Sequence, residues 1–324
     1  MSYKVVNNII FFDSDFNKIL DNKIIQVIKL CNTIYFNNYD NIKTFIKTEN
    51  KYDDDNYFWK RSKFNQPINN LPNSIIHLIL GWDFNQPINN LPNSIIHLIL
   101  CGLFNQSINN LPNSITHLEF YKYSHFNQPI NNLPNSITYL KLGGCFNQPI
   151  NNLPNSIIYL TFDFYFNQPI NDLPDSIIYL KLDYYFNQLI NNLPLLLTHL
   201  TLNDCFNQLI NNLPLSLTHL ILGYNFNQPI NDLPYSLTNL TLGKLFNQQI
   251  NDLPNSITNL ILGSNFNQSI NCLPNSITHL TLGNCFNQTI NCLPLSLKEI
   301  QIDQNNKNIN KIKVKFPECK IVEY

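Results

Sequence analysis

The triplet Phe-Asn-Gln recurs twelve times in the 324-residue chain, and it limits the possible folds more than any other feature of the sequence. Successive copies start 20 residues apart, except for one step of 22 residues between Phe104 and Phe126. The first copy begins at Phe64 and reads FNQPINNLPNSIIHLILGWD. Counting from the Phe as position 0, all twelve copies keep Asn at +1, Gln at +2, Ile at +4, Asn at +5, Leu at +7 and Pro at +8. Repetition at this period is typical of solenoid proteins.

The length and the apolar pattern of the repeat favour stacked coils. Each copy has six apolar positions, and the stretch I-x-x-L-x-L ends in the period-two alternation of a β-strand. The proline at +8, and the frequent proline at +3, exclude a helix across the other half of the copy. Twenty residues are too few for a strand, a helix and two turns, so each copy is one coil. Stacked coils bury the apolar side chains that a lone coil leaves exposed.

We therefore predict a β-rich solenoid of twelve coils over residues 64–303, with short parallel strands on one face, irregular return segments and a cap at each end. Residues 1–63 are predicted to form degenerate first coils. Segments 24–30 and 42–47 resemble the strand pattern, and Phe16-Asn17 resembles a decayed Phe-Asn-Gln. A separate small partner-binding domain is the alternative for this region. Residues 304–324 alternate polar and apolar residues, which predicts a capping strand over the last coil.

The composition follows from the repeat and excludes several classes of function. The chain contains no Ala, and its eight Gly all fall in the turn after the strand, where we expect them to adopt positive φ. Residues 64–303 carry 5 Lys against 9 Asp and 2 Glu, which argues against nucleic-acid binding. No apolar run is long enough to span a membrane. The eight cysteines follow no disulfide framework, so we expect a cytoplasmic protein. We also expect the protein to be monomeric.

The invariant polar residues are predicted to satisfy the backbone of the coils. Stacked Asn side chains can bond to one another and to the unpaired backbone groups of the bends. We therefore predict a buried inner ladder of the asparagines at +1, and we expect the Ser at +10 to cap the turn before the strand. The ladder comprises Asn65, Asn85, Asn105, Asn127, Asn147, Asn167, Asn187, Asn207, Asn227, Asn247, Asn267 and Asn287.

The pattern I-x-x-L-x-L followed by L-P-x-S resembles a leucine-rich repeat of the shortest kind, and FNQPI…LP…L-x-L resembles the FNIP repeat more closely. The resemblance covers residues 64–303. That family occurs in social amoebae and in giant DNA viruses of amoebae, so a viral member would act in the host cytoplasm. The resemblance implies a leucine-rich-repeat-like solenoid with a role in protein interaction, including virus–host interaction. Viral members that resemble F-box proteins at their N-terminus imply a substrate receptor of a ubiquitin ligase.

Histidine and cysteine recur at fixed repeat positions, which favours a structural role over a metal site or a catalytic site. Six of the seven histidines share position +13 on the outward side of the strand, where neighbouring copies carry Tyr or Asn. Three such imidazoles in register could bind a metal or sense pH. No carboxylate recurs beside them, and no Cys-x-x-Cys occurs, although Cys272 and Cys292 share position +6 in adjacent copies and could form a disulfide. We predict no catalytic residue, no metal and no cofactor.

Specificity is expected in the outward columns, because stacking fixes the other positions. The third to sixth copies are rich in Tyr at +13 and in the turn at +17 to +19, and the two-residue insertion falls there. We predict a non-enzymatic interaction scaffold that binds a protein partner at this strand-face patch; a ubiquitin-ligase substrate receptor and a surface or carbohydrate-recognition protein are the alternatives. The predicted partner site comprises Tyr121, Tyr123, Tyr139, Tyr159, Phe164, Tyr179, Tyr184, Lys141, Lys181, Asp163 and Asp183.

Overall fold

The computed structural model describes residues 3–36, 62–304, 306, 309–316 and 318–323. The chain divides into two compact units, Met1–Phe164 and Tyr165–Tyr324. Each unit is a β-solenoid of coils of about 20 residues, as the repeat predicts.

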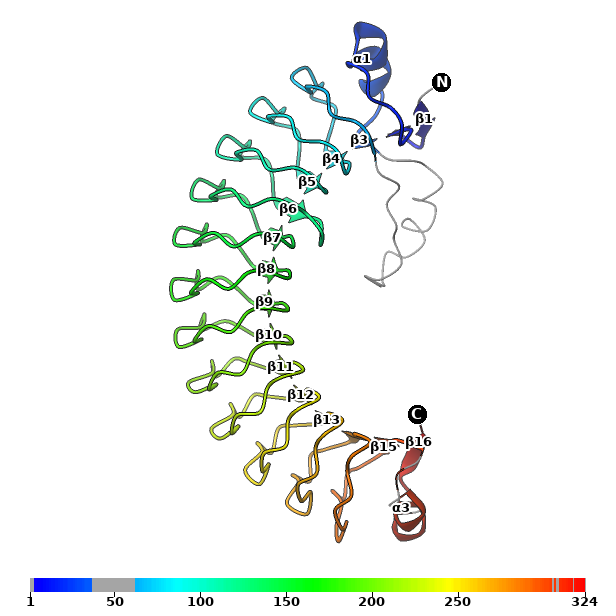
Figure 1. Cartoon of the computed structure of the whole chain (residues 1–324), viewed down its shortest axis with the longest axis vertical. Helices are drawn as coiled ribbons and strands as arrows, with labels where there is room; N and C mark the ends of the chain where they lie inside the picture. Colours follow the sequence, from blue (N-terminus) through cyan, green and yellow to red (C-terminus); the bar gives the residue numbers. More distant parts are fainter. Residues whose placement is uncertain (1–2, 37–61, 305, 307–308, 317, 324) are drawn as a thin grey trace. The chain divides into compact units, whose positions relative to one another are not determined.

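In the first unit the strands follow one another in chain order (Figure 1). β1 pairs antiparallel with β2 through a hairpin whose turn residues, Asn7 and Asn8, both have positive φ, as a two-residue turn of type I′ requires. Every later pairing described in this unit is parallel. The elements are β1 Tyr3–Val6, β2 Ile9–Phe12, α1 Asn22–Ile28, β3 Thr33–Tyr35, β4 His77–Leu80, β5 His97–Leu100, β6 His117–Phe120, β7 Tyr139–Leu142 and β8 Tyr159–Phe162.

In the second unit all the described pairings are parallel, and repeat-related residues face each other, as His199 faces His219. The register therefore follows the repeat, because each strand pairs with its copy one coil away. The elements are β9 Tyr179–Leu182, β10 His199–Leu202, β11 His219–Leu222, β12 Asn239–Leu242, β13 Asn259–Leu262, β14 His279–Leu282, β15 Glu299–Ile302, α3 Ile309–Lys315 and β16 Lys320–Glu323.

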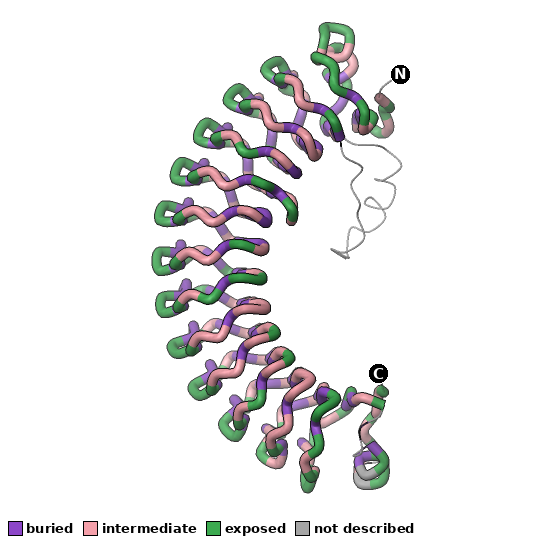
Figure 2. Tube along the Cα trace, viewed as in Figure 1, coloured by how far each residue is buried: buried purple, intermediate pink, exposed green. Residues whose placement is uncertain are grey.

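The core of each unit is a set of apolar columns that run from coil to coil. The phenylalanines at position 0 are buried and stack with ring centroids 6.0–6.2 Å apart in the first unit and 6.1–6.3 Å apart in the second. The Leu residues at +14 and +16 point inward beside them, whereas the residues at +5 and +6 are exposed, apart from the half-buried Asn271. Figure 2 shows the same division, with exposed residues at the tips of the return segments. Burial is thus shared between coils.

The glycines of the turn serve close approach between coils, and the expectation of positive φ is wrong for seven of the eight. Among the described glycines only Gly102 has a positive φ, of 48°. A Cβ added to Gly243 would lie 2.0 Å from the carbonyl oxygen of Gly223, and one added to Gly263 would lie 2.1 Å from that of Gly243. Real Cβ atoms do not approach backbone oxygen so closely, so a side chain at these two positions would require the neighbouring backbone to shift.

At the chain ends, segment 24–30 is corrected from strand to helix over most of its length, and the predicted capping strand over 304–324 is present only as β16, Lys320–Glu323, which pairs with β15 of the last coil, with a helix before it. Residues 22–28 form α1, because the Asp21 carboxylate accepts a hydrogen bond from the backbone N–H of Ile24 at 2.9 Å and caps the helix. Residues 309–315 form α3, in which Ile309 and Ile312 are buried at the i, i+3 spacing of a helix. Segment 42–47 lies outside the described residues.

Phe16 and Asn17 make the contacts of a Phe-Asn-Gln motif. The Phe16 ring is buried and stacks on Phe64, with centroids 5.8 Å apart. The Asn17 side-chain oxygen accepts from the backbone N–H of Asn65 at 2.9 Å and from the side-chain amide of Gln66 at 3.1 Å. β3 follows in the same coil and pairs in parallel with β4. The described residues before Phe64 therefore continue the sheet of the first unit.

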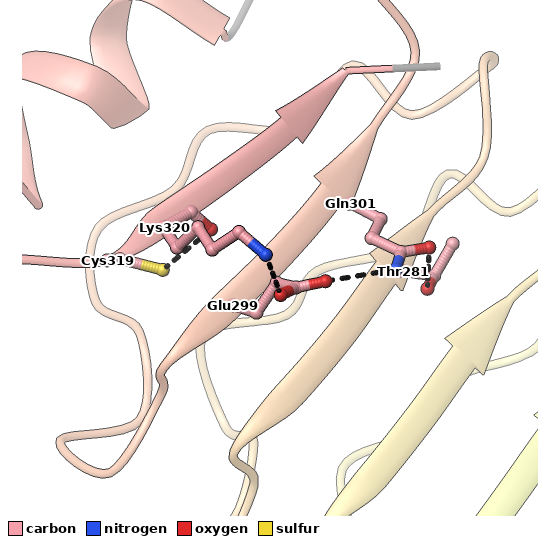
Figure 3. A network of polar contacts seen from close by, with 5 residues as sticks. All are labelled: Thr281, Glu299, Gln301, Cys319 and Lys320. Atoms are coloured by element: carbon pink, nitrogen blue, oxygen red, sulfur yellow. Dashed lines mark hydrogen bonds and ion pairs between the residues drawn. The ribbon is translucent and has the colours of Figure 1, made fainter.

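A polar network closes the sheet at the other end of the chain, where β16 pairs in parallel with β15 (Figure 3). The Lys320 ammonium lies 2.7 Å from a Glu299 carboxylate oxygen, and the Gln301 amide donates to the other oxygen at 3.1 Å. These two donors lower the pKa of the Glu299 carboxyl. The Asn306 side chain is buried one repeat after Phe286 and donates to the Phe286 carbonyl at 2.8 Å, so an amide ends the phenylalanine stack.

Candidate interaction surface

Two ladders of neutral polar side chains join the coils. The Asn65 side-chain oxygen accepts from the backbone N–H of Asn85 at 2.9 Å and from the side-chain amide of Gln86 at 3.1 Å. Asn85 does the same for the next coil, and the pattern continues through both units. The asparagines at +1 are half-buried or exposed, not fully buried as predicted.

The second ladder uses the serines at +10. The Ser94 hydroxyl donates to the Ile75 carbonyl of the preceding coil at 2.6 Å, and later serines repeat this bond. Sequence reasoning expected a cap on the turn of the same coil, and it assigned no role to Gln at +2. The invariance of that Gln was the available signal. These polar positions therefore stack the coils, which leaves the variable positions to carry specificity.

The outward residues at +13 form a column of neighbouring rings in the first unit. In the first unit the centroids of His77 and His97 lie 4.5 Å apart, those of His97 and His117 lie 4.2 Å apart, and Tyr139 and Tyr159 continue the column. Partial burial and the neighbouring histidines lower the pKa of His97 to about 4, and burial lowers the pKa of His77 and His117. These imidazoles are consequently neutral at pH 7.

The lowered pKa of His97 predicts acid sensitivity of the first unit. Below pH 6.5 the unfolded His97 binds a proton that the folded ring, with a pKa of about 4, does not bind. The free energy of unfolding therefore falls as the pH drops from 6.5 toward 4. We expect His97 to account for about 1 kcal/mol of this loss, because solvent screens the half-exposed ring. Urea unfolding followed from pH 7 to pH 4.5 measures the loss.

The matched variants separate His97 from the other titrating groups. His97→Asn, which places at this site the residue that copies such as Asn239 carry in the same column, should flatten the fall in stability. His125→Asn alters an exposed histidine outside the column and should retain the wild-type slope. Identical slopes for wild-type protein and His97→Asn would contradict the prediction.

The two-residue insertion of the third copy forms an aromatic cluster on the turns of the first unit, which we call the turn cluster: Tyr121, Lys122, Tyr123 and Phe164. The Tyr123 ring stacks on Phe164 at 5.9 Å and lies edge-on to Tyr121 at 6.1 Å. The Lys122 ammonium lies 5.5 Å from the Phe164 ring centroid and 6.0 Å from that of Tyr123. Tyr123 remains 51% exposed. The cluster thus presents aromatic surface and a cation together.

A glycine pair in the intervening coil allows this arrangement. Phe164 belongs to the second coil after the insertion, and Gly143 and Gly144 occupy the turn between them. A Cβ on Gly143 would lie 2.2 Å from the Tyr121 carbonyl oxygen, and one on Gly144 would lie 2.5 Å from that of Lys122. The insertion therefore lies directly over the two glycines, and a Cβ at either position would require the neighbouring backbone to shift.

The charged residues predicted for the partner site are mostly engaged inside the fold. Asp163 is only 5% exposed, so its prediction as a contact residue is wrong, because a buried side chain offers no surface to a partner. Lys141 pairs with Glu119 of the adjacent strand at 3.2 Å, and both side chains are largely covered. Cross-strand pairing of opposite charges stabilises the sheet face.

The remaining predicted residues lie in the second unit. Lys181 pairs with Asp183 at 3.4 Å, and the Asn203 amide donates to Asp183 at 2.6 Å. The Tyr179 ring lies tilted against that of His199 at +13 of the next coil, with centroids 5.9 Å apart. Tyr184 lies edge-on to Tyr185, which in turn stacks on Tyr165. The predicted patch is thus divided between the two units, and the turn cluster is its most exposed described part in the first unit, together with Tyr159 at 47%.

No group of three or more His, Cys, Asp or Glu side chains in the described part of the chain is arranged to hold a metal ion. Among the described helices, none has the length and hydropathy needed to cross a bilayer.

Parallel strands one coil apart, a phenylalanine stack and side-chain ladders with the repeat period define a leucine-rich-repeat-like solenoid protein. The FNIP Repeat family matches residues 64–102, 104–145, 126–165, 166–205, 189–225, 206–244, 226–252 and 246–285. The chain belongs to the FNIP-repeat family, as the sequence resemblance implies.

A solved structure with 40% identity agrees with this assignment. The chain is similar to CroV588, described as a novel circular LRR protein structure, with 40% identity and a TM-score of 0.77 over 93% of this chain and 48% of that one. The chain thus spans about half the length of CroV588. YopM from Yersinia enterocolitica WA-314 matches with 18% identity and a TM-score of 0.43, over 80% of this chain and 66% of YopM. No curated protein matches the chain.

Proposed function

We propose that the chain is a non-enzymatic interaction scaffold that binds a protein partner through the turn cluster and the adjoining Tyr139 and Tyr159 of the ring column. The observation that carries this proposal is the turn cluster itself. It is built by the single departure from the 20-residue period, and it leaves Tyr123 half exposed above a glycine pair. Stacking of the coils does not require such an insertion, since eleven copies lack it.

The chemistry of the cluster suits a protein surface. Tyrosine offers a large contact area and a hydroxyl group at low entropic cost, and interface hot spots are enriched in it. Lys122 adds a cation beside the rings, which favours a partner segment that carries a carboxylate next to apolar side chains. The excess of acidic residues over residues 64–303 disfavours a nucleic acid in this role.

The same proposal assigns the chain to a reducing compartment, as a monomer in the cytoplasm. All eight cysteines are free thiols in the structure, and Cys31 and Cys101 are buried among apolar residues as small hydrophobic side chains. A non-enzymatic role agrees with the use of the invariant Asn, Gln and Ser side chains for bonds between coils.

Partner capture with matched variants tests the proposed surface. Proximity labelling in the native cell identifies binding partners, and purified full-length protein then measures the affinity for each. The double variant Tyr123→Ser, Tyr159→Ser should weaken binding at least ten-fold, because it removes the two most exposed rings of the surface. Its urea unfolding midpoint should stay close to that of the wild type.

The control variant is Tyr235→Ser, which removes a ring that is 85% exposed on a return segment. It should bind as the wild type does. Equal affinities for wild type and the double variant would refute the proposed surface, whereas equal loss in both variants would assign binding to another face.

A further inference from the structure

Two exposed thiols occupy equivalent positions in the last two Phe-Asn-Gln coils. Cys272 and Cys292 both lie at position +6, in the exposed turn of the return segment. The ten other copies carry Asn or Asp at this position. A residue type that appears only in two consecutive coils, at the same point of each, places the two side chains beside each other.

The register of the two coils is fixed on both sides of the cysteine pair. The backbone N–H of Asn287 donates to the Asn267 side-chain oxygen at 2.8 Å, and that of Asn291 donates to the Asn271 side-chain oxygen at 3.0 Å. Beyond the pair, the Leu295 N–H donates to Asn275 at 3.3 Å. Each bond joins residues 20 positions apart, so Cys292 lies opposite Cys272 with no slip between the coils.

The sulfur of Cys292 contacts the backbone next to its counterpart. It donates to the carbonyl oxygen of Asn271 at 3.0 Å, and Asn271 directly precedes Cys272. Standard peptide geometry therefore places this sulfur within about 6 Å of the Cα atom of Cys272. Two bridged cysteines have their Cα atoms about 4.4–6.8 Å apart, and a Cys292 sulfur this close to the Cys272 backbone is compatible with a bridge.

We propose that Cys272 and Cys292 form a reversible disulfide that fastens the last Phe-Asn-Gln coil to the one before it. The oxidant is a low-molecular-weight disulfide of the glutathione type. One cysteine thiolate attacks this reagent, forms a mixed disulfide and expels one thiolate. The second cysteine thiolate then attacks the protein-bound sulfur and expels the other. The two protons of the cysteines pass to the expelled thiolates, and the two electrons reduce the reagent to two thiols.

The coil that the bridge would fasten is more exposed than the coils before it. Leu273 and Leu293 at +7 are half-buried, whereas Leu253 at the same position is buried. Ile290 at +4 is likewise half-buried, whereas Ile270 is buried. A terminal coil opens more readily than an internal one, because only one neighbour covers it fully. A bridge in the return segment restrains this opening.

Oxidation of the full-length protein with glutathione disulfide tests the proposal. Peptide mapping under non-reducing conditions should show a Cys272–Cys292 link that a reductant reverses. Hydrogen exchange of the amides in residues 290–297 should slow at least ten-fold on oxidation. The link and the slowed exchange should both disappear in Cys272→Ser, in which Cys292 should carry glutathione instead.

Cys285 provides the matched control, because it is an exposed thiol of the same two coils at another position. Cys285→Ser should retain both the link and the slowed exchange. The proposal is overturned if both cysteines are converted to stable glutathione adducts with no link between them. It is also overturned if the dominant link joins either cysteine to Cys285 or Cys319.

Discussion

Replacing Phe226 with alanine is expected to lower the free energy of unfolding by about 3–5 kcal/mol. Phe226 is fully buried, and its ring stacks at 6.1 Å on Phe206 on one side and at 6.1 Å on Phe246 on the other. Its removal opens a cavity that two interfaces between coils share. Because the stability of a solenoid is close to a sum of coil and interface terms, both interfaces weaken together. Equilibrium urea unfolding of full-length protein measures the loss.

Tyr235→Ser is the control for this measurement. It removes a ring from the neighbouring return segment that is 85% exposed, so its effect should stay within about 0.5 kcal/mol. A loss below about 1 kcal/mol for Phe226→Ala would contradict the assignment of the phenylalanine stack as the core of the second unit.

Replacing Gly243 with alanine is expected to destabilise the protein by about 1–3 kcal/mol through crowding between coils. The added Cβ would lie 2.0 Å from the Gly223 carbonyl oxygen and 2.9 Å from that of Leu222. Both contacts are to backbone, which cannot turn aside as a flexible side chain can. Gly243 has no positive φ, so backbone strain adds nothing to the expected loss. The urea midpoint again measures the effect.

The adjacent exposed residue supplies the comparison. Lys244→Ala trims a side chain whose ammonium lies 4.9 Å from the Tyr224 ring centroid, and a loss below about 1 kcal/mol is expected from this surface contact. If Gly243→Ala proves as mild as Lys244→Ala, the glycine column is not a close contact between coils in solution.

The regular part of the fold could be predicted from the sequence. Because every copy carries the same apolar residues at the same positions, the coils bury these residues only when they stack in register. The strands His199–Leu202 and His219–Leu222 lie where the alternation predicts them. The helices at the ends could not be predicted in this way. Ile24 to Leu30 matches the strand pattern by residue type. Most of this segment lies in α1 instead, because Asp21 caps a helix there and β3 is the strand that pairs with β4.

The candidate site divides in the same manner. The sequence locates the aromatic residues around the insertion, since Tyr121 and Tyr123 interrupt the period. It does not show that Asp163 is buried, or that Lys141 faces Glu119, because both outcomes depend on the side chains of neighbouring coils. The close approach of the insertion to Gly143 and Gly144 is likewise visible only in the structure.

The sequence by itself determined the repeat length, the strand positions and the family, because periodic burial is a property of residue order alone. Tertiary structure decided what the constant polar residues bond to and which variable residues reach solvent. The Asn and Gln at +1 and +2 read alike in every copy, yet they form an exposed or half-buried ladder between coils. The physical reason is that the partner of a hydrogen bond between coils, and the residues that bury a carboxylate, lie 20 or more positions away in the sequence. Only the stacking of the coils brings these groups together.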